Sequence, residues 1–385
     1  MNLPSPASTA SPPPPALTHT LRWWPAALLV LAMLLLRMIP AFVESPSLPV
    51  IFTSFLGPAV AALLVLGWWL AISRATIRER ILGAVGTVAL IAVAILLLHP
   101  TLSGMSAIMY VLPYGFAAFA ITLCLLAPRP SLRLPVALAA VALTVGYWDL
   151  LQSAGVDGTF QPELSWRWEP TAEERFLQTV AATPTTPAPG DSAATPSVEA
   201  ITLASSPWPA FRGPLRDGRQ PGIVLNADWE QAPPKPIWKK PIGPGWSSFS
   251  VAGNRLFTQE QRGDDEAVVC LDATTGDVLW VSAYPSRFWE AVAGAGPRGT
   301  PTIADEGLFA LGANGVLVSL DPLTGSKRWS RDLQKDADRK PPMWGFASSP
   351  LVTQGLVIVH AGGAGNKGVL AYRATDGELA WSVPS

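Results

Sequence analysis

Five long apolar stretches dominate the first part of the chain. They run approximately from Trp23 to Val43, Val50 to Ser73, Ile81 to His99, Met105 to Ala127, and Leu134 to Leu151. A helix needs about 20 mostly apolar residues to cross a bilayer, because each backbone amide must find its hydrogen-bonding partner inside the segment. The pattern therefore predicts an α-helical transmembrane bundle of about five helices over residues 21–152.

The placement of arginines predicts the orientation of this bundle. Arginines stand before the first stretch and in the loops after the second and fourth: Arg22, Arg74, Arg78, Arg80, Arg129 and Arg133. The alternate loops, 44–49 and 100–104, contain no Lys or Arg. Because short basic loops stay in the cytoplasm, we expect an inner-membrane protein with its N-terminus inside and its second half in the periplasm. Arg37, late in the first stretch, either snorkels to the membrane surface or faces the bundle.

Low-complexity segments flank the bundle. Residues 1–20 are rich in Pro, Ser and Ala, which is typical of a disordered tail, here on the cytoplasmic side. Residues 153–206 contain a Thr/Pro/Ala-rich run that begins near Thr179. Such a composition buries too little apolar surface to fold, so these residues are predicted to form an extracytoplasmic linker.

From residue 207 onward, strand-like runs recur at a constant interval. Three segments align: VVCLDATTGDVLW ending at Trp280, LVSLDPLTGSKRW ending at Trp329, and VLAYRATDGELAW ending at Trp381, with spacings of 49 and 52 residues. A second landmark begins at Gly245, Gly296 and Gly345 and repeats in phase, with spacings of 51 and 49. Repeats of this length are typical of propellers and solenoids, so residues 207–385 are predicted to form an all-β propeller.

Each repeat is interpreted as a hairpin that carries a docking side chain. A turn glycine supplies a positive φ, and the indole four residues later offers a large flat area for packing on the neighbouring sheet. The residues expected to dock one sheet on the next are Asp272, Gly276, Trp280, Asp321, Gly325, Trp329, Gly377 and Trp381. Arg373 replaces the turn aspartate in the third repeat, which indicates either a degenerate blade or drift at a surface turn.

Charge and cysteine content narrow the function classes. Residues 1–149 carry seven Lys/Arg and three Asp/Glu, whereas residues 150–385 carry 20 and 25, with the basic residues scattered among the acidic ones. This distribution argues against nucleic acid as a partner. The two cysteines and three histidines lie in unlike segments, so they predict no disulfide framework, zinc site or catalytic triad.

The repeats resemble those of the pyrroloquinoline quinone (PQQ) propellers. The Ala-x-Asp-x-x-Thr-Gly-x-x-x-Trp-like motif carries the resemblance, together with WPAFRGPLRDGRQPG from Trp208 to Gly222 and the strand around Trp238. The family includes quinoprotein dehydrogenases and non-enzymatic relatives such as the outer-membrane assembly lipoprotein. The layout also resembles membrane-bound quinoprotein sugar dehydrogenases, whose helices dock a membrane quinone.

The resemblance implies where cofactors would bind. In the family, PQQ and a divalent cation such as Ca2+ lie at the mouth of the propeller, among loops from several blades. Calcium needs oxygen ligands, and a quinone with carboxylates needs basic and aromatic groups. The candidate cofactor-binding residues are Arg262, Asp264, Asp265, Arg298, Thr300, Trp344 and Ser348. The adjacent Cys pair of some quinoprotein alcohol dehydrogenases is absent, and no catalytic base or metal ligand is assigned.

The sequence leaves several functions open. The leading hypothesis is a membrane-anchored, extracytoplasmic platform that binds a ligand or another protein, because docking repeats are present and a recognisable catalytic set is not. The alternative is a quinoprotein dehydrogenase that oxidises a sugar or alcohol and passes electrons to membrane quinone. A third interpretation makes the helices a transporter or sensor. Rings close with four to eight blades, whereas the sequence provides about three to four, so the chain is expected to be a fragment of a longer propeller.

Overall fold

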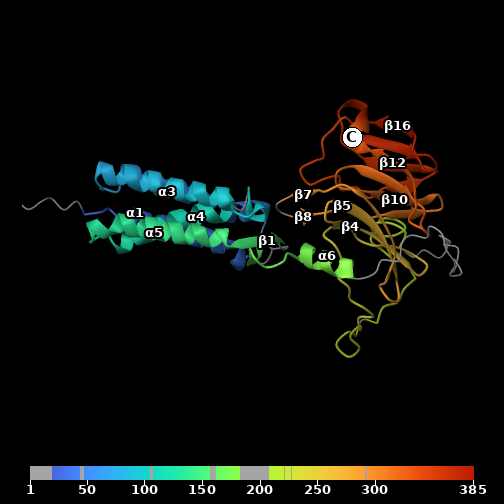
Figure 1. The fold of residues 1–385 in the computed structure, drawn as a ribbon, viewed down its shortest axis with the longest axis horizontal. Coiled ribbons are helices and arrows are strands. Elements are labelled where there is room, and N and C mark those ends of the chain that lie inside the picture. Colours follow the sequence, from blue (N-terminus) through green and yellow to red (C-terminus); the bar gives the residue numbers. More distant parts are fainter. Residues whose placement is uncertain are drawn as a thin grey trace, which may run out of the picture. The chain divides into compact units, whose positions relative to one another are not determined.

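The chain folds into two compact units in a computed structural model (Figure 1). The structure describes residues 20–43, 47–104, 107–156, 162–182, 208–220, 222–226, 228–290 and 293–385. Residues 1–153 with 164–167 form the first unit, and residues 154–163 with 168–385 form the second. Residues 1–19 of the predicted tail and residues 183–206 of the predicted linker lie outside the described residues.

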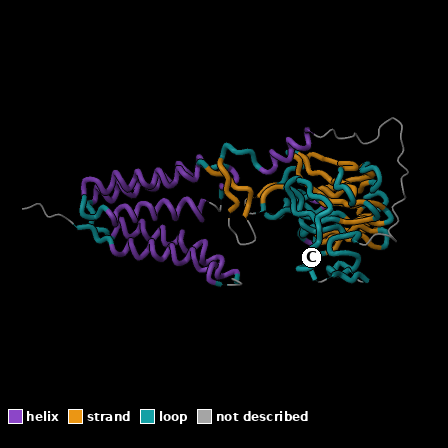
Figure 2. The backbone as a smooth tube through the Cα atoms, turned by 90° about the horizontal axis from the view of Figure 1, so that it is seen from below, coloured by secondary structure: helices purple, strands orange, loops and turns teal. Residues whose placement is uncertain are grey.

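Among its described residues, the first unit contains five helical stretches that are long and apolar enough to cross a membrane, as the sequence predicted. They are Trp24–Phe42, Leu48–Ala71, Ile77–Leu97, Ala107–Leu125 and Pro130–Asp149. These stretches consist of α1 (Trp24–Met38) with η1 (Ile39–Phe42), α2 (Leu48–Ala71), α3 (Ile77–Leu97), η3 (Ala107–Val111) with α4 (Leu112–Leu125), and α5 (Pro130–Asp149). A short helix, η2 (Pro100–Leu102), follows α3. The long helices run side by side in both views (Figures 1 and 2).

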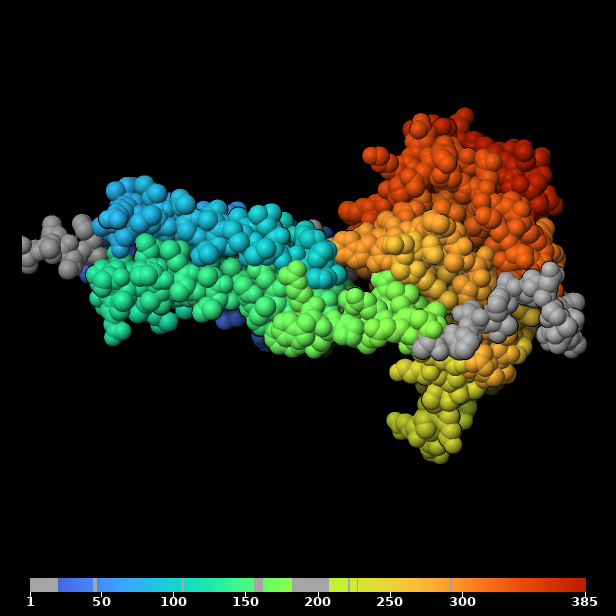
Figure 3. All heavy atoms as spheres, viewed as in Figure 1, coloured from blue at the N-terminus to red at the C-terminus, as the bar shows by residue number. Residues whose placement is uncertain are grey.

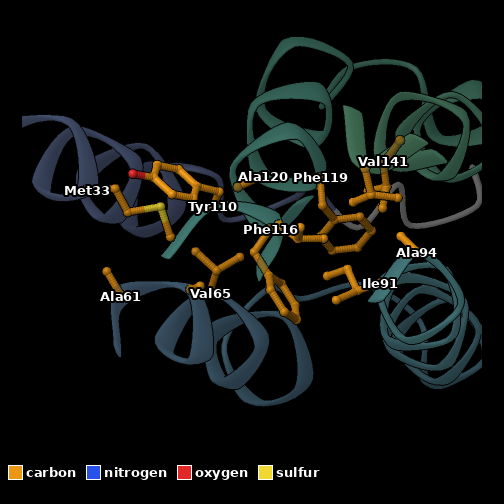
Figure 4. Packing of buried hydrophobic residues seen from close by; sticks show 14 of the residues in the cluster. Met33, Ala61, Val65, Ile91, Ala94, Tyr110, Phe116, Phe119, Ala120 and Val141 are labelled. Atoms are coloured by element: carbon orange, nitrogen blue, oxygen red, sulfur yellow. The ribbon is translucent and has the colours of Figure 1, made fainter. Parts of the chain in front are cut away.

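The bundle packs around aromatic and small side chains of α4. Phe116 and Phe119 are buried and lie among Val65, Ile91 and Val141 from three other helices (Figure 4). Many remaining apolar side chains of the spans point outward and are exposed. An outer surface of this kind suits contact with lipid, because lipid-facing residues have no need of protein neighbours.

Arg37 faces the interior of the bundle. Its guanidinium lies 5.0 Å from the ring centres of both Phe55 and Tyr110. It also donates a hydrogen bond of 3.1 Å to the Tyr110 hydroxyl. Of the two placements that the sequence left open, the structure has the inward one.

The arginine-bearing ends of the helices gather at one end of the bundle. The Arg22 amide donates to the Ser73 carbonyl over 2.9 Å, which joins the start of α1 to the α2–α3 loop. Thr76 and Glu79 form a capping box at the start of α3, and Arg133 at the start of α5 pairs with Glu79 over 2.8 Å. The loop arginines named above therefore share one end.

The second unit is built on three four-stranded antiparallel sheets, in which each strand pairs with the next along the chain. Sheet 1 contains β3 (Ser250–Ala252), β4 (Arg255–Arg262), β5 (Asp265–Asp272) and β6 (Val278–Pro285). Sheet 2 contains β9 (Thr302–Ala304), β10 (Gly307–Leu311), β11 (Val316–Leu320) and β12 (Lys327–Asp332). Sheet 3 contains β13 (Leu351–Thr353), β14 (Leu356–His360), β15 (Val369–Arg373) and β16 (Leu379–Val383).

Smaller elements connect these parts. They are β1 (Leu151–Val156), β2 (Pro162–Trp166), α6 (Ala172–Ala182), β7 (Trp289–Glu290), β8 (Gly294–Ala295), α7 (Leu333–Asp336) and η5 (Gly365–Lys367). The pair β7 and β8 forms a short hairpin between sheets 1 and 2.

An indole over a glycine joins each sheet to the element before it. The pairs are Trp238 with Gly276, Trp280 with Gly325, and Trp329 with Gly377. A Cβ added to the glycine would stand 2.7, 2.5 and 2.7 Å from the indole in that order, so only glycine fits beneath the ring. Each indole nitrogen donates to the carbonyl three residues before the glycine, over 2.9, 3.2 and 2.8 Å. Trp381 occupies the corresponding position of sheet 3 and is exposed.

The replacement of aspartate by Arg373 leaves the turn of sheet 3 intact. In sheet 1, the Gly276 amide donates to the Asp272 carbonyl over 2.8 Å, and in sheet 3 the Gly377 amide donates to the Arg373 carbonyl over 2.9 Å. The Arg373 side chain instead pairs with Asp376 at 3.1 Å. Sheet 3 therefore keeps its turn and its four strands despite the substitution.

Residues 208–216, which we call the crossing segment, contact all three sheets. The Trp208 carbonyl accepts from Val251 in β3 over 2.7 Å, and the Pro209 carbonyl accepts from Ile303 in β9 over 2.9 Å. The Arg216 guanidinium donates to the carbonyl of Pro350, immediately before β13. The first strands of the three sheets are therefore tied to one piece of chain.

Helix α6 lies within the stretch predicted as linker, and it packs on sheet 1 (Figure 3). Phe176 is buried against Gly243, where an added Cβ would stand 2.9 Å from its ring. Glu173 pairs with Arg287 over 2.7 Å. This helix was not predicted, because it is only 11 residues long and borders the Thr/Pro/Ala-rich run.

Candidate functional site

The predicted cofactor-binding residues lie at the same end of the three sheets. We call this the loop end; it comprises the β4–β5 turn and the connections 286–301 and 333–350. Arg262, Asp264 and Asp265 lie at the turn, Arg298 and Thr300 in the first connection, and Trp344 and Ser348 in the second. The Ser286 amide donates to the Asp264 carbonyl over 3.1 Å, which holds the first connection against the turn.

Arg262 is engaged by neighbouring protein groups. Its guanidinium pairs with Glu260 over 2.6 Å and lies 5.8 Å from the centre of the Phe176 ring in α6. Glu260 in turn accepts from the Gly243 amide over 2.9 Å. Asp264 is exposed beside it at the turn, and Asp265 is half-buried. The arginine therefore helps to fix α6 and the residues before sheet 1.

Arg298 is half-buried, with its side chain 7% exposed and surrounded by partners. It pairs with Glu290 over 3.2 Å, donates to the Gly294 carbonyl over 2.8 Å, and lies 5.1 Å from the centre of the Phe288 ring. Burial lowers the pKa of Arg298, and the charges of Glu290 and Glu266 oppose that shift. The guanidinium thus stabilises the β7–β8 hairpin.

Thr300 belongs to a hydrogen-bonded series that runs from sheet to sheet. The Ser248 amide donates to the Thr300 hydroxyl, and the Thr300 amide donates to the Ser349 hydroxyl, each over 2.9 Å. These three residues lie just before the first strands of successive sheets. In the described part of the chain, the neighbouring Ser348 hydroxyl is buried without a hydrogen-bond partner.

Glu266 is a buried acid at the loop end that the sequence did not single out. Its carboxylate accepts from the Ala313 amide over 2.9 Å and from the Ser286 hydroxyl over 3.0 Å, which ties sheet 1 to sheet 2. Burial raises the pKa of Glu266, although these donors act in the opposite direction. A Cβ at Gly312 would stand 2.1 Å from the carboxylate. Position 312 therefore requires glycine, because the Glu266 carboxylate fills the space that a side chain there would need.

A hollow of about 720 Å3 lies on the face of sheet 1 that points away from sheet 2. Its walls come from α6, from the chain between Trp238 and Phe249, and from the sheet. Val269, Leu271 and Val278 provide apolar surface, while Lys239 and Lys240 line it with charge. The other face of sheet 1 is covered, because Phe257, Cys270 and Trp280 pack into one cluster with side chains of sheet 2.

The charged side chains at the loop end are largely engaged by other groups of the chain. The two arginines that would meet carboxylates of PQQ are each paired with a glutamate of the chain. No group of three or more His, Cys, Asp or Glu side chains is placed to hold a metal ion within the described ranges. The arrangement serves to join loops and sheets.

Comparison with known proteins identifies the repeats of the second unit. Residues 227–343 and again 289–385 match the family described as outer membrane protein assembly factor BamB. The chain therefore combines an N-terminal bundle of apolar helices with a C-terminal all-β propeller region of PQQ-repeat type, which confirms the predicted fold class.

Individual relatives match only in part. The BamB of Alteromonas naphthalenivorans is 26% identical over 143 residues, which cover 33% of this chain and 31% of the relative. A quinohemoprotein alcohol dehydrogenase from Pseudomonas putida HK5 is 24% identical with a TM-score of 0.28, over 37% of this chain and 20% of that one. BamB from Moraxella catarrhalis is 18% identical with a TM-score of 0.21, over 35% and 47%. The chain thus spans about a third of the length of its curated relative.

Proposed function

We propose that this chain anchors a protein-binding platform of PQQ-repeat type in the cytoplasmic membrane, with the β region outside. The orientation is supported by the loop arginines, which share one end of the helix bundle, because basic loops remain in the cytoplasm. The similarity to a family described as an assembly factor supports a role in binding protein.

The hollow beside sheet 1 is the observation that carries this proposal. Trp238 lies over Gly276 in the same way that Trp280 and Trp329 lie over glycines of sheets 2 and 3. Between sheets 1 and 2 that contact accompanies a closely packed interface, whereas beside Trp238 it borders the hollow. We infer that a β-sheet of the partner protein occupies the hollow and covers Leu271 and Val278 with its apolar face.

Site-specific photocrosslinking tests the proposal. Benzoylphenylalanine at Val278, which is 47% exposed and lines the hollow, should crosslink a discrete partner in membranes of the producing cell. The matched control is Leu379, which is 45% exposed at the same repeat position of sheet 3. Leu271→Asp in the Val278 variant should reduce the crosslink several-fold, because a charge there opposes apolar packing. Equal crosslinking at both positions would contradict a partner in the hollow.

The same protein separates this proposal from the dehydrogenase. Solubilised full-length chain is supplied with PQQ, Ca2+, a panel of sugars and alcohols, and an artificial electron acceptor. If the chain is a protein-binding platform, the dye stays oxidised under all conditions. Dye reduction that requires PQQ and is abolished by a chelator would overturn the platform in favour of the enzyme.

A further inference from the structure

The loop end carries a patch of large exposed side chains, of which Trp344 is also a predicted cofactor-binding residue. Trp246 is 62% exposed, Trp289 40%, Met343 73% and Trp344 47%. They come from three different connections: the lead into β3, the β7–β8 hairpin, and the lead into β13. We call these four residues the aromatic patch.

Contacts between the connections bring these residues to the same end of the β region. The Trp246 indole donates to the Ala293 carbonyl over 2.8 Å, which places it on the β7–β8 hairpin that carries Trp289. Gly345, next to Trp344, lies against Phe288, whose ring would be 3.2 Å from an added Cβ. The patch therefore extends across the starts of all three sheets.

The chemistry of the patch matches the surface of a bilayer. An indole combines a large apolar area with one N–H donor, and for this reason tryptophan favours the membrane–water interface. A cluster of such side chains in water marks an interaction surface. The chain supplies a bilayer of its own, because it contains five helical stretches able to cross one.

The path of the chain adds a second argument. After the last candidate span ends at Asp149, the chain reaches α6, and Glu173 of α6 pairs with Arg287. Arg287 lies two residues before Trp289 of the patch. The segment that comes from the membrane is therefore fixed to the same end of the sheets as the aromatic patch.

We propose that the aromatic patch inserts into the headgroup region of the membrane that holds the chain's own helices. The loop end then faces lipid, and the opposite end, with the turns of Gly276, Gly325 and Gly377, faces away from it. This inference concerns how the β region meets the membrane, and it holds whether or not a protein occupies the hollow.

Fluorescence quenching of the full-length chain in phosphatidylcholine nanodiscs tests this. In a Cys124→Ser background, an environment-sensitive fluorophore is attached to Met343→Cys or, as control, to Thr275→Cys, which is exposed at the opposite end of sheet 1. Cys270 is fully buried and does not compete for the label. Headgroup-labelled quencher lipid should lower emission at position 343 at least about twofold and leave position 275 unchanged, since quenching requires contact with lipid.

A second variant shows whether the patch is responsible. Adding Trp289→Ser and Trp344→Ser to the Met343→Cys protein should return its emission toward that of the control. Equal quenching at both positions, or quenching that survives removal of both indoles, overturns the proposal. The proposal is also overturned if the fluorophore at position 343 is shielded in native membranes but not in nanodiscs. That result would mean that a protein covers the patch.

Discussion

Gly325 and Gly355 provide a matched pair for measuring the indole contact. Both have φ of +72°, but an added Cβ at Gly325 would stand 2.5 Å from Trp280, whereas nothing lies within 4 Å at Gly355. Alanine costs about 1–2 kcal/mol at either position through its backbone conformation. Gly325→Ala should lower the free energy of opening of sheet 2 by about 2 kcal/mol more than Gly355→Ala lowers that of sheet 3. Hydrogen exchange of β11 and β15 measures this; equal losses would show that the indole contact contributes nothing.

Glu266 should make the stability of the β region depend on pH. Burial raises its pKa in the folded state, so the folded chain holds this proton more tightly than the unfolded chain does. The stability that the Glu266 proton contributes is therefore fully present below the ordinary carboxyl pKa of about 4.3. It is lost as the pH rises through the raised pKa of the folded state. Glu266→Gln cannot titrate and should lack this part of the slope. The measurement is urea unfolding of the solubilised wild-type chain and of the Glu266→Gln variant between about pH 4 and pH 8. If the free energies of unfolding of the two proteins change with pH in parallel, the idea is wrong.

The seven predicted loop residues illustrate what residue types reveal. Their positions within the repeats were enough to predict that they share one end of the sheets, because each follows or precedes a strand whose direction is known. Their partners were not predictable. Glu290 and Glu260 neutralise Arg298 and Arg262, and neither acid belongs to a repeated motif. Glu266 was missed because a single acid in a strand resembles a solvent-facing residue.

At the scale of elements, α6 depends on a single buried side chain. Phe176 is buried, whereas the other positions between residues 172 and 181 are half-buried or exposed. Phe176→Ala should release the helix, at a cost of up to about 3 kcal/mol, the lower end of the range for a buried phenylalanine. Hydrogen exchange of the α6 amides in the full chain should accelerate in this variant and stay unchanged in Gln178→Ala, which alters an exposed position. Unchanged protection after Phe176→Ala would mean that the Glu173–Arg287 pair holds the helix alone.

Helices and strands could be predicted from the sequence wherever a single physical requirement determines them. The five spans begin and end within a few residues of their predicted limits, except where α3 and α5 extend earlier, because apolar length alone determines them. Strand pairs followed from turns such as Asp272 to Gly276. The β7–β8 hairpin was not predicted, since its two-residue strands carry no alternation.

At the scale of the whole molecule, repetition predicted the number and order of sheets but not the ties among them. The docking glycines recur at fixed intervals, whereas the connections 286–301 and 333–350 differ in length and composition. The hollow beside sheet 1 also lacked a sequence signal, because it arises from α6 and the chain around Ile242. The platform and the membrane-facing patch are separate proposals, and their experiments fail independently.

Stacked repeats ordinarily contact only their immediate neighbours, so an array of this kind can fray from one end without disturbing the other. The crossing segment alters that behaviour. Its carbonyls and its arginine reach β3, β9 and the residue before β13, so sheets 1 and 3 are also connected through this segment and not through sheet 2 alone. Loosening of the last repeat should therefore also loosen the first, because both are held by the same piece of chain.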